Sequence, residues 1–248
     1  MTSELHRRLY DHYVSGGQAS VPADPSELAL RAPYCRRLIR ERFPADRDAR
    51  ILDLGCGWGA LVHFAREAGY RNVSGVDGAT QQVEAAAKLG IEGVSEGGVL
   101  ETLEAAPAGS WDLVVAFDVV EHFDKEGLPR LVDAVHGALS DGGRWIIHVP
   151  NGESPLFGSI LYGDLTHELA FTRRSMSQLL LASGFDDVQC YEEAPVAHGL
   201  RSFVRTLVWR VIRAALRVYV AVEEGGEVSR AVLSRNLLVS ARKAASSG

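Results

Sequence analysis

The sequence predicts an α/β fold in which helices cover both faces of a doubly wound, mostly parallel sheet of seven strands. Short apolar runs alternate with amphipathic segments of helical period from residue 50 to residue 192. The first run breaks into a glycine-rich turn that opens a helix. Polar and acidic residues follow several runs, where the carboxyl ends of parallel strands meet. We expect the ligands to bind along that edge.

The order of elements follows from these runs and from the glycines that end the helices. Strands are expected at 50–54, 72–77, 91–95, 113–117, 144–149, 185–192 and 235–241. Helices are expected between them at 60–67, 81–89, 128–139 and 175–182. Two further amphipathic helices, 4–14 and 26–43, precede the first strand, and Ser26 after Pro25 is the expected start of the second.

Composition describes one globular domain of 248 residues with 46% hydrophobic residues and a net charge of −6. Residues 201–248 hold nine basic and three acidic residues, whereas residues 1–200 hold seventeen basic and twenty-nine acidic ones. An acidic main body argues against nucleic acid as a partner. Cys35, Cys56 and Cys190 are too far apart for a disulfide framework or a zinc site. With no leader-like or membrane-spanning run recognised, we expect a cytoplasmic protein.

The glycine turn has two interpretations. Gly55, Gly57 and Ala60 satisfy the dinucleotide fingerprint, which would indicate a nicotinamide-dependent oxidoreductase. Asp53 and the additional Gly59 argue against it, because a carboxylate at the end of the strand would repel a pyrophosphate. The same carboxylate suits a ligand that carries an ammonium group.

Asp53-x-Gly55-x-Gly57-x-Gly59 resembles motif I of the class I S-adenosylmethionine-dependent methyltransferases. The resemblance implies a Rossmann-like sheet whose last strand runs antiparallel. It also implies that the turn holds the methionine and ribose of S-adenosylmethionine, with Asp53 at the amino-acid end. The residues expected to bind the cofactor are Asp53, Gly55, Cys56, Gly57, Gly59, Asp77, Gly78, Val99 and Asp118.

Asp77 lies eighteen residues after Gly59, at the end of the second strand, and is expected to bind both ribose hydroxyls. The alternative is a turn aspartate before Gly78. Beyond the third strand the sequence departs from the family, because Gly98 stands where an acid is expected to hold the adenine amine. Backbone groups near Val99, Glu96 or Glu101 remain as candidates for that contact.

Asp118, Glu121 and His122 form an acid-x-x-Glu-His run after the fourth strand. A run of similar spacing in the ubiquinone-type O-methyltransferases has been associated with a bound cation. Two carboxylates and an imidazole could hold magnesium or zinc. We favour the alternative that Glu121 and His122 fix the loop and the next helix, and we expect no metal.

The tract after the fifth strand joins a Pro150-Asn151 turn to His167, Phe171-Thr172 and a helix that ends at Gly184. This order, over residues 51–191, resembles bacterial methyltransferases that modify surface-polysaccharide and secondary-metabolite sugars. The resemblance implies methyl transfer, expected on oxygen, to a sugar-like or other small polar acceptor, which includes glycan and lipid-linked molecules. His167 is the first candidate for the base and His122 the second. Either could instead be a loop histidine that satisfies backbone groups.

Residues 200–219 place apolar side chains at helical spacing, with arginines and no acid on the remaining faces. Such a helix could lie on an anionic membrane. We favour a structural role, in which it covers its own domain or pairs with a second copy. A non-catalytic cofactor-binding or membrane-docking module is thus a further alternative to an enzyme.

We expect a single methyltransferase domain, 1–248. It divides into the N-terminal helices (1–49), a cofactor-binding core (50–194) with an acceptor loop (151–172), a helical insertion (195–230), and the last strand and tail (231–248).

Overall fold

The computed structural model describes residues 26–195, 200–225 and 231–245, and only 8–9, 12, 16–17, 21–22 and 24 before them. Most of the helix predicted at 4–14 therefore lies outside the described residues. The first helix described from end to end is α2 (Ser26–Arg42), which accommodates Pro33 in its interior.

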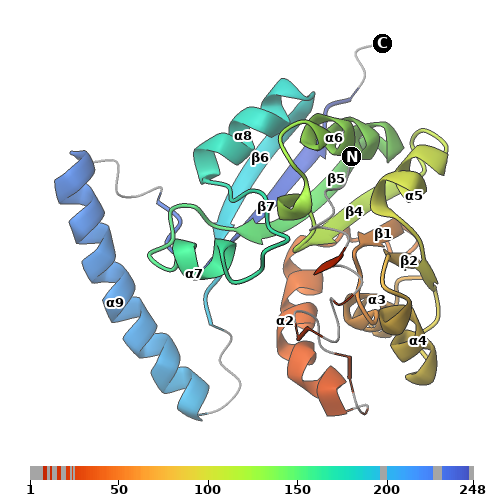
Figure 1. Ribbon diagram of the computed structural model, residues 1–248, viewed down its shortest axis with the longest axis horizontal. Helices are drawn as coiled ribbons and strands as arrows, with labels where there is room; N and C mark the ends of the chain where they lie inside the picture. The colour runs from red at the N-terminus through yellow and green to blue at the C-terminus, as the bar shows by residue number, and fades with distance from the viewer. Residues whose placement is uncertain are drawn as a thin grey trace.

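Seven strands form one sheet in the order β3-β2-β1-β4-β5-β7-β6, which confirms the predicted fold class (Figure 1). The strands are β1 (Arg50–Leu54), β2 (Asn72–Asp77), β3 (Val94–Glu96), β4 (Trp111–Phe117), β5 (Leu139–Pro150), β6 (Phe185–Glu192) and β7 (Asn236–Lys243). The last strand, β7, lies between β5 and β6 and runs antiparallel to both. The other neighbouring pairs are parallel, so their carboxyl ends share one edge.

Helices cover the two faces of the sheet with separate apolar cores. On one face α2, α3 (Ala60–Glu67) and α4 (Thr80–Lys88) pack over buried side chains that include Ile51 and Val62. On the other face α5 (Val99–Ala105), α6 (Gly127–Ala138) and α8 (Arg173–Ala182) pack over a core that contains Trp145 and Met176. Both cores leave the carboxyl edge of the strands free for a ligand site.

Two elements lie outside these layers. The short α7 (Phe157–Leu161) belongs to the loop after β5, and α9 (Leu200–Glu224) connects β6 to β7. In Figure 1, α9 stands to one side of the sheet, beyond α7. No helix within the described residues is long and apolar enough to cross a membrane.

The structure differs from the predicted elements where glycine or a cap decides the boundary. The third strand begins at Val94 and not at residue 91, because the chain turns at Gly90 and Gly93, both with positive φ. The helix predicted to begin at residue 175 begins at Arg173, since the Thr172 hydroxyl accepts the backbone N–H of Ser175. The helices α5 and α7 were not predicted. The three cysteines are free thiols.

Candidate functional site

The glycine turn between β1 and α3 is built for close approach to its backbone. Gly55, Gly57 and Gly59 have φ values of +62°, +54° and +80°, a region that residues with a Cβ rarely adopt. A Cβ on Gly55 would collide with Val119, and one on Gly59 would lie 2.7 Å from a methyl group of Val94. A Cβ on Gly57 would meet only Gln82 Oε1, at 3.8 Å. The turn is therefore packed at both ends and more open at Gly57.

Asp77, at the end of β2, holds this turn. Its Oδ2 accepts the backbone N–H of Gly57 at 2.8 Å, and its Oδ1 accepts the backbone N–H of Ala79 at 2.9 Å. Burial raises the pKa of Asp77, although the two hydrogen bonds oppose the shift. The alternative of a turn aspartate is thus present in the structure, and ribose binding by the same carboxylate stays a prediction.

Asp53 is a buried carboxyl group in β1, only 4% exposed. Burial, and then the nearby charge of Asp77, raises the pKa of Asp53 to about 8. A positively charged ligand group at this position would stabilise the ionised carboxylate. Burial and both carboxylates also raise the pKa of the Cys56 thiol, so Cys56 is a packing residue of the turn and no nucleophile.

Glu101, in the first turn of α5, lies where an acid after β3 was expected. Gly98 precedes the first residue of the helix, Val99. A Cβ on Gly98 would lie 2.6 Å from Glu101 Oε2, so the Glu101 carboxylate occupies the space of a side chain at residue 98. Glu96 is exposed at the end of β3. Of the candidates for the adenine contact, the geometry favours Glu101 over Glu96.

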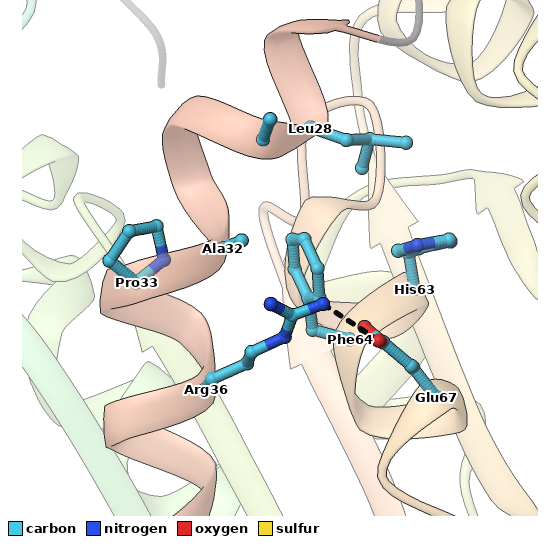
Figure 2. Close-up of a pocket in the computed structure, with 8 residues that line it drawn as sticks. Leu28, Ala32, Pro33, Arg36, His63, Phe64 and Glu67 are labelled. Atoms are coloured by element: carbon cyan, nitrogen blue, oxygen red, sulfur yellow. Dashed lines mark hydrogen bonds and ion pairs between the residues drawn. The ribbon is translucent and has the colours of Figure 1, made fainter. Parts of the chain in front are cut away.

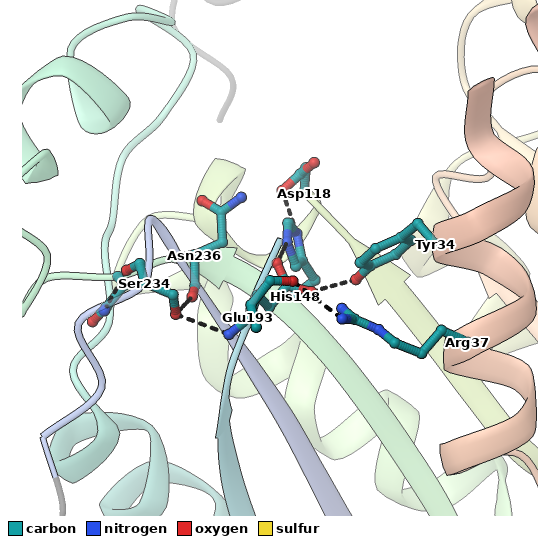
Figure 3. A network of polar contacts seen from close by, with 9 residues as sticks. Tyr34, Arg37, Asp118, His148, Glu193, Ser234 and Asn236 are labelled. Atoms are coloured by element: carbon teal, nitrogen blue, oxygen red, sulfur yellow. Dashed lines mark hydrogen bonds and ion pairs between the residues drawn. The ribbon is translucent and has the colours of Figure 1, made fainter. Parts of the chain in front are cut away.

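A buried polar network, drawn in Figure 3, joins four elements at the same edge of the sheet. His148 in β5 places Nδ1 2.8 Å from Asp118 Oδ1 and Nε2 2.9 Å from Glu193 Oε2. The Tyr34 hydroxyl of α2 donates to Glu193 Oε1 at 2.5 Å. The Arg37 guanidinium donates to the Ala194 carbonyl at 3.1 Å. The network ties the N-terminal helix to the ends of β4, β5 and β6.

The charges of this network favour an ionised triad. Burial lowers the pKa of His148, but the charges and hydrogen bonds of Asp118 and Glu193 outweigh it and raise that pKa well above its usual value. Removal from water opposes ionisation strongly at the buried Glu193 and only in part at the more exposed Asp118, and His148 lowers the pKa values of both carboxyls. Asp118 adopts φ +54°, which is unusual for a residue with a side chain and marks local strain. Its side chain is 60% exposed, so an ionised carboxylate points into the open edge.

A second cluster brings Glu121 and His122 together with His167 from the acceptor loop. The two imidazole rings lie 4.9 Å apart between their centroids, in an edge-to-face arrangement. The Glu121 carbonyl accepts the backbone N–H groups of Glu168 and Leu169, at 2.8 and 3.1 Å. These contacts dock the acceptor loop onto the segment after β4. That Glu121 and His122 fix the loop after β4 and the next helix stays a prediction.

The side chain of Glu121 has a different environment from its backbone. It is fully buried, and among the described residues neither carboxylate oxygen has a hydrogen-bond partner. Burial, and then the charge of Asp118, raises its pKa well above the usual value. Ligand atoms of Glu121, His122 and His167 all lie within 4.8 Å of one another. A carboxylate and two imidazoles fit zinc or a similar divalent ion, better than magnesium with its preference for oxygen. In this cluster the third possible ligand is His167, and not Asp118 as the sequence suggested.

A groove of about 390 Å³ lies elsewhere, between α2 and α3 (Figure 2). It is lined by apolar side chains such as Leu28 and Phe64, and an ion pair of 2.7 Å joins Arg36 to Glu67 beside it. It lies along the later turns of α3, away from the glycine turn. None of the predicted site residues lines it.

The predicted cofactor residues, including Gly78 next to Asp77, lie at the ends of β1, β2 and β4, in the turns after β1 and β2, or, for Val99, at the start of α5. His148, Glu193 and Tyr34 were not predicted. A doubly wound sheet with this glycine turn and these carboxylates defines a class, that of α/β proteins that bind a nucleoside-type cofactor. Residues 28–190 match the methyltransferase domain family. The chain belongs to that family, which favours the methyltransferase interpretation of the glycine turn over the dinucleotide one.

Similar proteins agree with this assignment. The chain is 29% identical to a probable fatty acid methyltransferase of Mycobacterium tuberculosis over 45% of its own length and 27% of that protein. It is 31% identical to the ubiquinone biosynthesis O-methyltransferase of Bordetella avium over 47% of its length and 48% of the relative. It thus spans half or less of these curated relatives. A solved S-adenosylmethionine-dependent methyltransferase of Archaeoglobus fulgidus has the same fold, with a TM-score of 0.63 and 22% identity over 89% of this chain and all of that one.

Proposed function

We propose that this protein transfers the methyl group of S-adenosylmethionine to an oxygen atom of a small polar acceptor. The observation that carries the proposal is the placement of two histidines, His122 and His167, at the edge that also holds the glycine turn. The acceptor oxygen attacks the methyl carbon, the bond from that carbon to sulfur breaks, and S-adenosylhomocysteine leaves as a neutral thioether. The acceptor proton passes to a base in the site.

The cofactor is assigned to the glycine turn. Asp53 faces the ammonium group of the methionine end, and Asp77 binds the ribose diol in addition to the turn. Glu101 and the backbone near Val99 hold the adenine. Asp118, which points into the open edge from the end of β4, lies on the side of the sulfonium. The raised pKa of Asp53 and the open backbone at Gly57 support this arrangement.

The base is His167. Its Nδ1 lies 3.2 Å from the Ile160 carbonyl, which can only accept a hydrogen bond. Nδ1 therefore carries the hydrogen of the neutral ring, and Nε2 keeps its lone pair for the acceptor proton. His122 is the second candidate for the same reason. Its Nδ1 lies 3.2 Å from the Thr166 carbonyl and 3.0 Å from Thr166 Oγ1, whose own hydrogen goes to Asp164.

A divalent cation held by Glu121, His122 and His167 would polarise the acceptor oxygen as a Lewis acid. In that case the two histidines would serve as ligands and not as bases.

The acceptor is a small molecule with a hydroxyl group. The order of motifs after β5 supports a sugar-like acceptor, and the matched relatives are named for fatty acids and for ubiquinone biosynthesis. We therefore take the acceptor group to be a hydroxyl on a lipid-linked or glycan molecule. A reducing compartment and a cytoplasmic location remain predictions that the three free thiols support.

The test uses the whole chain. Calorimetry should detect binding of S-adenosylmethionine and none of NAD(H), and incubation with an acceptor pool should release S-adenosylhomocysteine. His167→Ala should lower the rate by about 10²–10⁴-fold and leave cofactor affinity unchanged. His136→Ala, in the last turn of α6, is the matched control and should keep full activity. A His167→Ala variant as active as the parent at every pH would assign proton removal to another group.

A further inference from the structure

The outward face of α9 is apolar over nearly its whole length. Large side chains recur at spacings of three, four and seven residues and so fall on one side of the helix. Exposed members of this stripe include Leu200 (80%), Phe203 (53%), Leu207 (44%), Val211 (71%), Val218 (64%) and Val222 (81%). Because these side chains remain in solvent, the helix does not cover its own domain with this face. That corrects one of the structural roles expected from the sequence.

The opposite face of α9 is the one that contacts the domain. Arg213 forms a close ion pair with Glu192 at the end of β6, and Arg217 lies 3.7 Å from the same carboxylate. The guanidinium of Arg213 also lies over the ring of Trp209, 5.3 Å from its centroid. This inward face, which also holds the half-buried Leu216 and Val220, is thus held to the end of β6 by its arginines. Arg213 and Arg217 find their counter-ion outside the helix, at the end of β6.

The remaining arginines border the apolar stripe. Arg201 and Arg205 lie on one side of it and Arg210 on the other, and all three are exposed. No acidic residue occurs from residue 200 to residue 222, although the first 200 residues carry an excess of acids. An apolar stripe between rows of positive charge matches the interface of an anionic bilayer, where acyl chains lie beneath negative headgroups.

We propose that the outward face of α9 docks this protein on the surface of a bilayer that contains anionic phospholipid. Charge decides against the main alternative, a second copy of the chain. Two such helices packed face to face would bring their arginine borders together along most of their length, with no acid before Glu223 near the end of each helix to offset them. Anionic headgroups neutralise the same arginines and accept the apolar side chains between them.

Docking would also bear on the methyl-transfer site. Glu192 pins α9, and the next residue, Glu193, binds His148 in the network that holds Asp118. The helix is therefore attached to the strand end that completes the site. In Figure 1 the α7 segment of the acceptor loop lies between the sheet and α9. An acceptor that resides in the bilayer would approach the site from this side.

The test measures co-sedimentation of the full chain with phosphatidylcholine vesicles, with and without phosphatidylglycerol. Neither cofactor nor acceptor is present, so the outcome is independent of the proposed activity. Binding should require phosphatidylglycerol and weaken as salt shortens the screening length from about 10 Å at 0.1 M to about 3 Å at 1 M. The triple variant Arg201→Gln with Arg205→Gln and Arg210→Gln should bind these vesicles about a hundredfold more weakly, or about fivefold for each arginine.

A matched triple variant, Arg40→Gln with Lys88→Gln and Lys125→Gln, removes the same charge from exposed positions far along the chain from α9. It should keep most of the affinity. Leu207→Gln with Val211→Gln, both at exposed positions, should abolish binding without loss of helix content. When Val211→Trp is made in the otherwise unchanged stripe, the fluorescence of the new side chain should be quenched by lipids that carry a nitroxide on the acyl chain.

Three results would overturn the proposal. One is equal binding to neutral vesicles, and another is equal weakening by the two triple variants. The third is a chain that ignores vesicles and sediments as a dimer that Leu207→Gln with Val211→Gln dissociates, because α9 would then be a contact between copies.

Discussion

Asp118 and Glu193, 75 residues apart in the chain, hold the two nitrogens of one buried ring. His148 Nδ1 lies 2.8 Å from Asp118, and His148 Nε2 lies 2.9 Å from Glu193. A protonated imidazole between two carboxylates is stable only when both remain ionised. The pKa values of the three side chains therefore define the pH range in which all of them are charged.

The stability of the protein should fall on both sides of that range. The pKa of His148 is raised above 6.5, so its contribution is complete below about pH 6.5 and is lost as pH rises through the raised pKa. The pKa values of Asp118 and Glu193 are lowered, so their contributions are lost only as pH falls below about 4. Urea unfolding as a function of pH measures both limits.

His148→Gln should remove the part of the alkaline decline that lies above about pH 8, beyond the range in which Asp53 contributes. At pH 6 it should cost about 3 kcal/mol, the lower end for a broken buried ion pair, because Asp118 stays open to solvent. His136→Gln, on α6, is a suitable control. If the His148→Gln variant kept the alkaline slope of the parent, another group would be responsible for it.

Asp53→Asn should stabilise the protein without ligand and weaken cofactor binding. The pKa of Asp53 rises to about 8 on folding, so the parent loses stability as pH rises from about 4 towards 8, and an amide does not. The variant should therefore melt at a higher temperature above pH 8. Its affinity for S-adenosylmethionine should fall by at least about tenfold, through loss of a charge-assisted contact of about 1.5–3 kcal/mol.

Asp133→Asn, at an exposed position of α6, should change neither property. An Asp53→Asn variant with parental affinity would remove the ammonium contact from the proposal.

Asp77 variants should separate the two roles of that carboxylate. Asp77→Ala frees the N–H groups of Gly57 and Ala79 and should cost about 1–3 kcal/mol of stability, while Asp77→Asn keeps one acceptor. If Asp77 also binds the ribose, the parent should prefer S-adenosylhomocysteine to its 2′-deoxy analogue by about tenfold or more. In Asp77→Asn that preference should shrink. An unchanged preference would leave Asp77 with the turn alone.

Glu121→Gln tests the cation. Zinc at a hundredfold excess over Kd should add about 2.7 kcal/mol to the free energy of unfolding of the parent, which is measured as a higher melting temperature. The isosteric Gln variant loses one ligand and should lose most of this effect, as should His167→Ala. Glu126→Gln, exposed before α6, should respond like the parent. If zinc did not change the melting temperature of the parent, Glu121 would act only through its backbone carbonyl, which docks the acceptor loop.

The glycine turn, Asp77 and the two histidines could be predicted because each depends on a local pattern at the end of a run. The fold class followed from the same alternation of runs. The two glycines at 97 and 98 hid the start of α5, because a helix without a side-chain cap leaves no signal at its first residue. Gly90 and Gly93 shortened β3 for a similar reason.

The network around His148 could not be predicted. His148 follows Ile146 and Ile147 in the buried second half of β5, and nothing local separates it from the rest of that run. Glu193 reaches it only because β7 enters the sheet between β5 and β6 and sets the distance between them. The division of the α9 arginines into paired and exposed ones depends in the same way on Glu192, which another strand supplies.

The place of β7 has a consequence for synthesis. β6 is the edge strand, and its neighbour in the sheet is the last strand of the chain. On the ribosome, β6 must therefore wait for roughly 50 further residues, which takes about 3–10 s at typical rates of translation. During that interval β1 to β5 and the glycine turn can already form, but His148 still lacks Glu193. The nascent chain should gain its cofactor turn first and its complete site only after β7 has emerged from the ribosome.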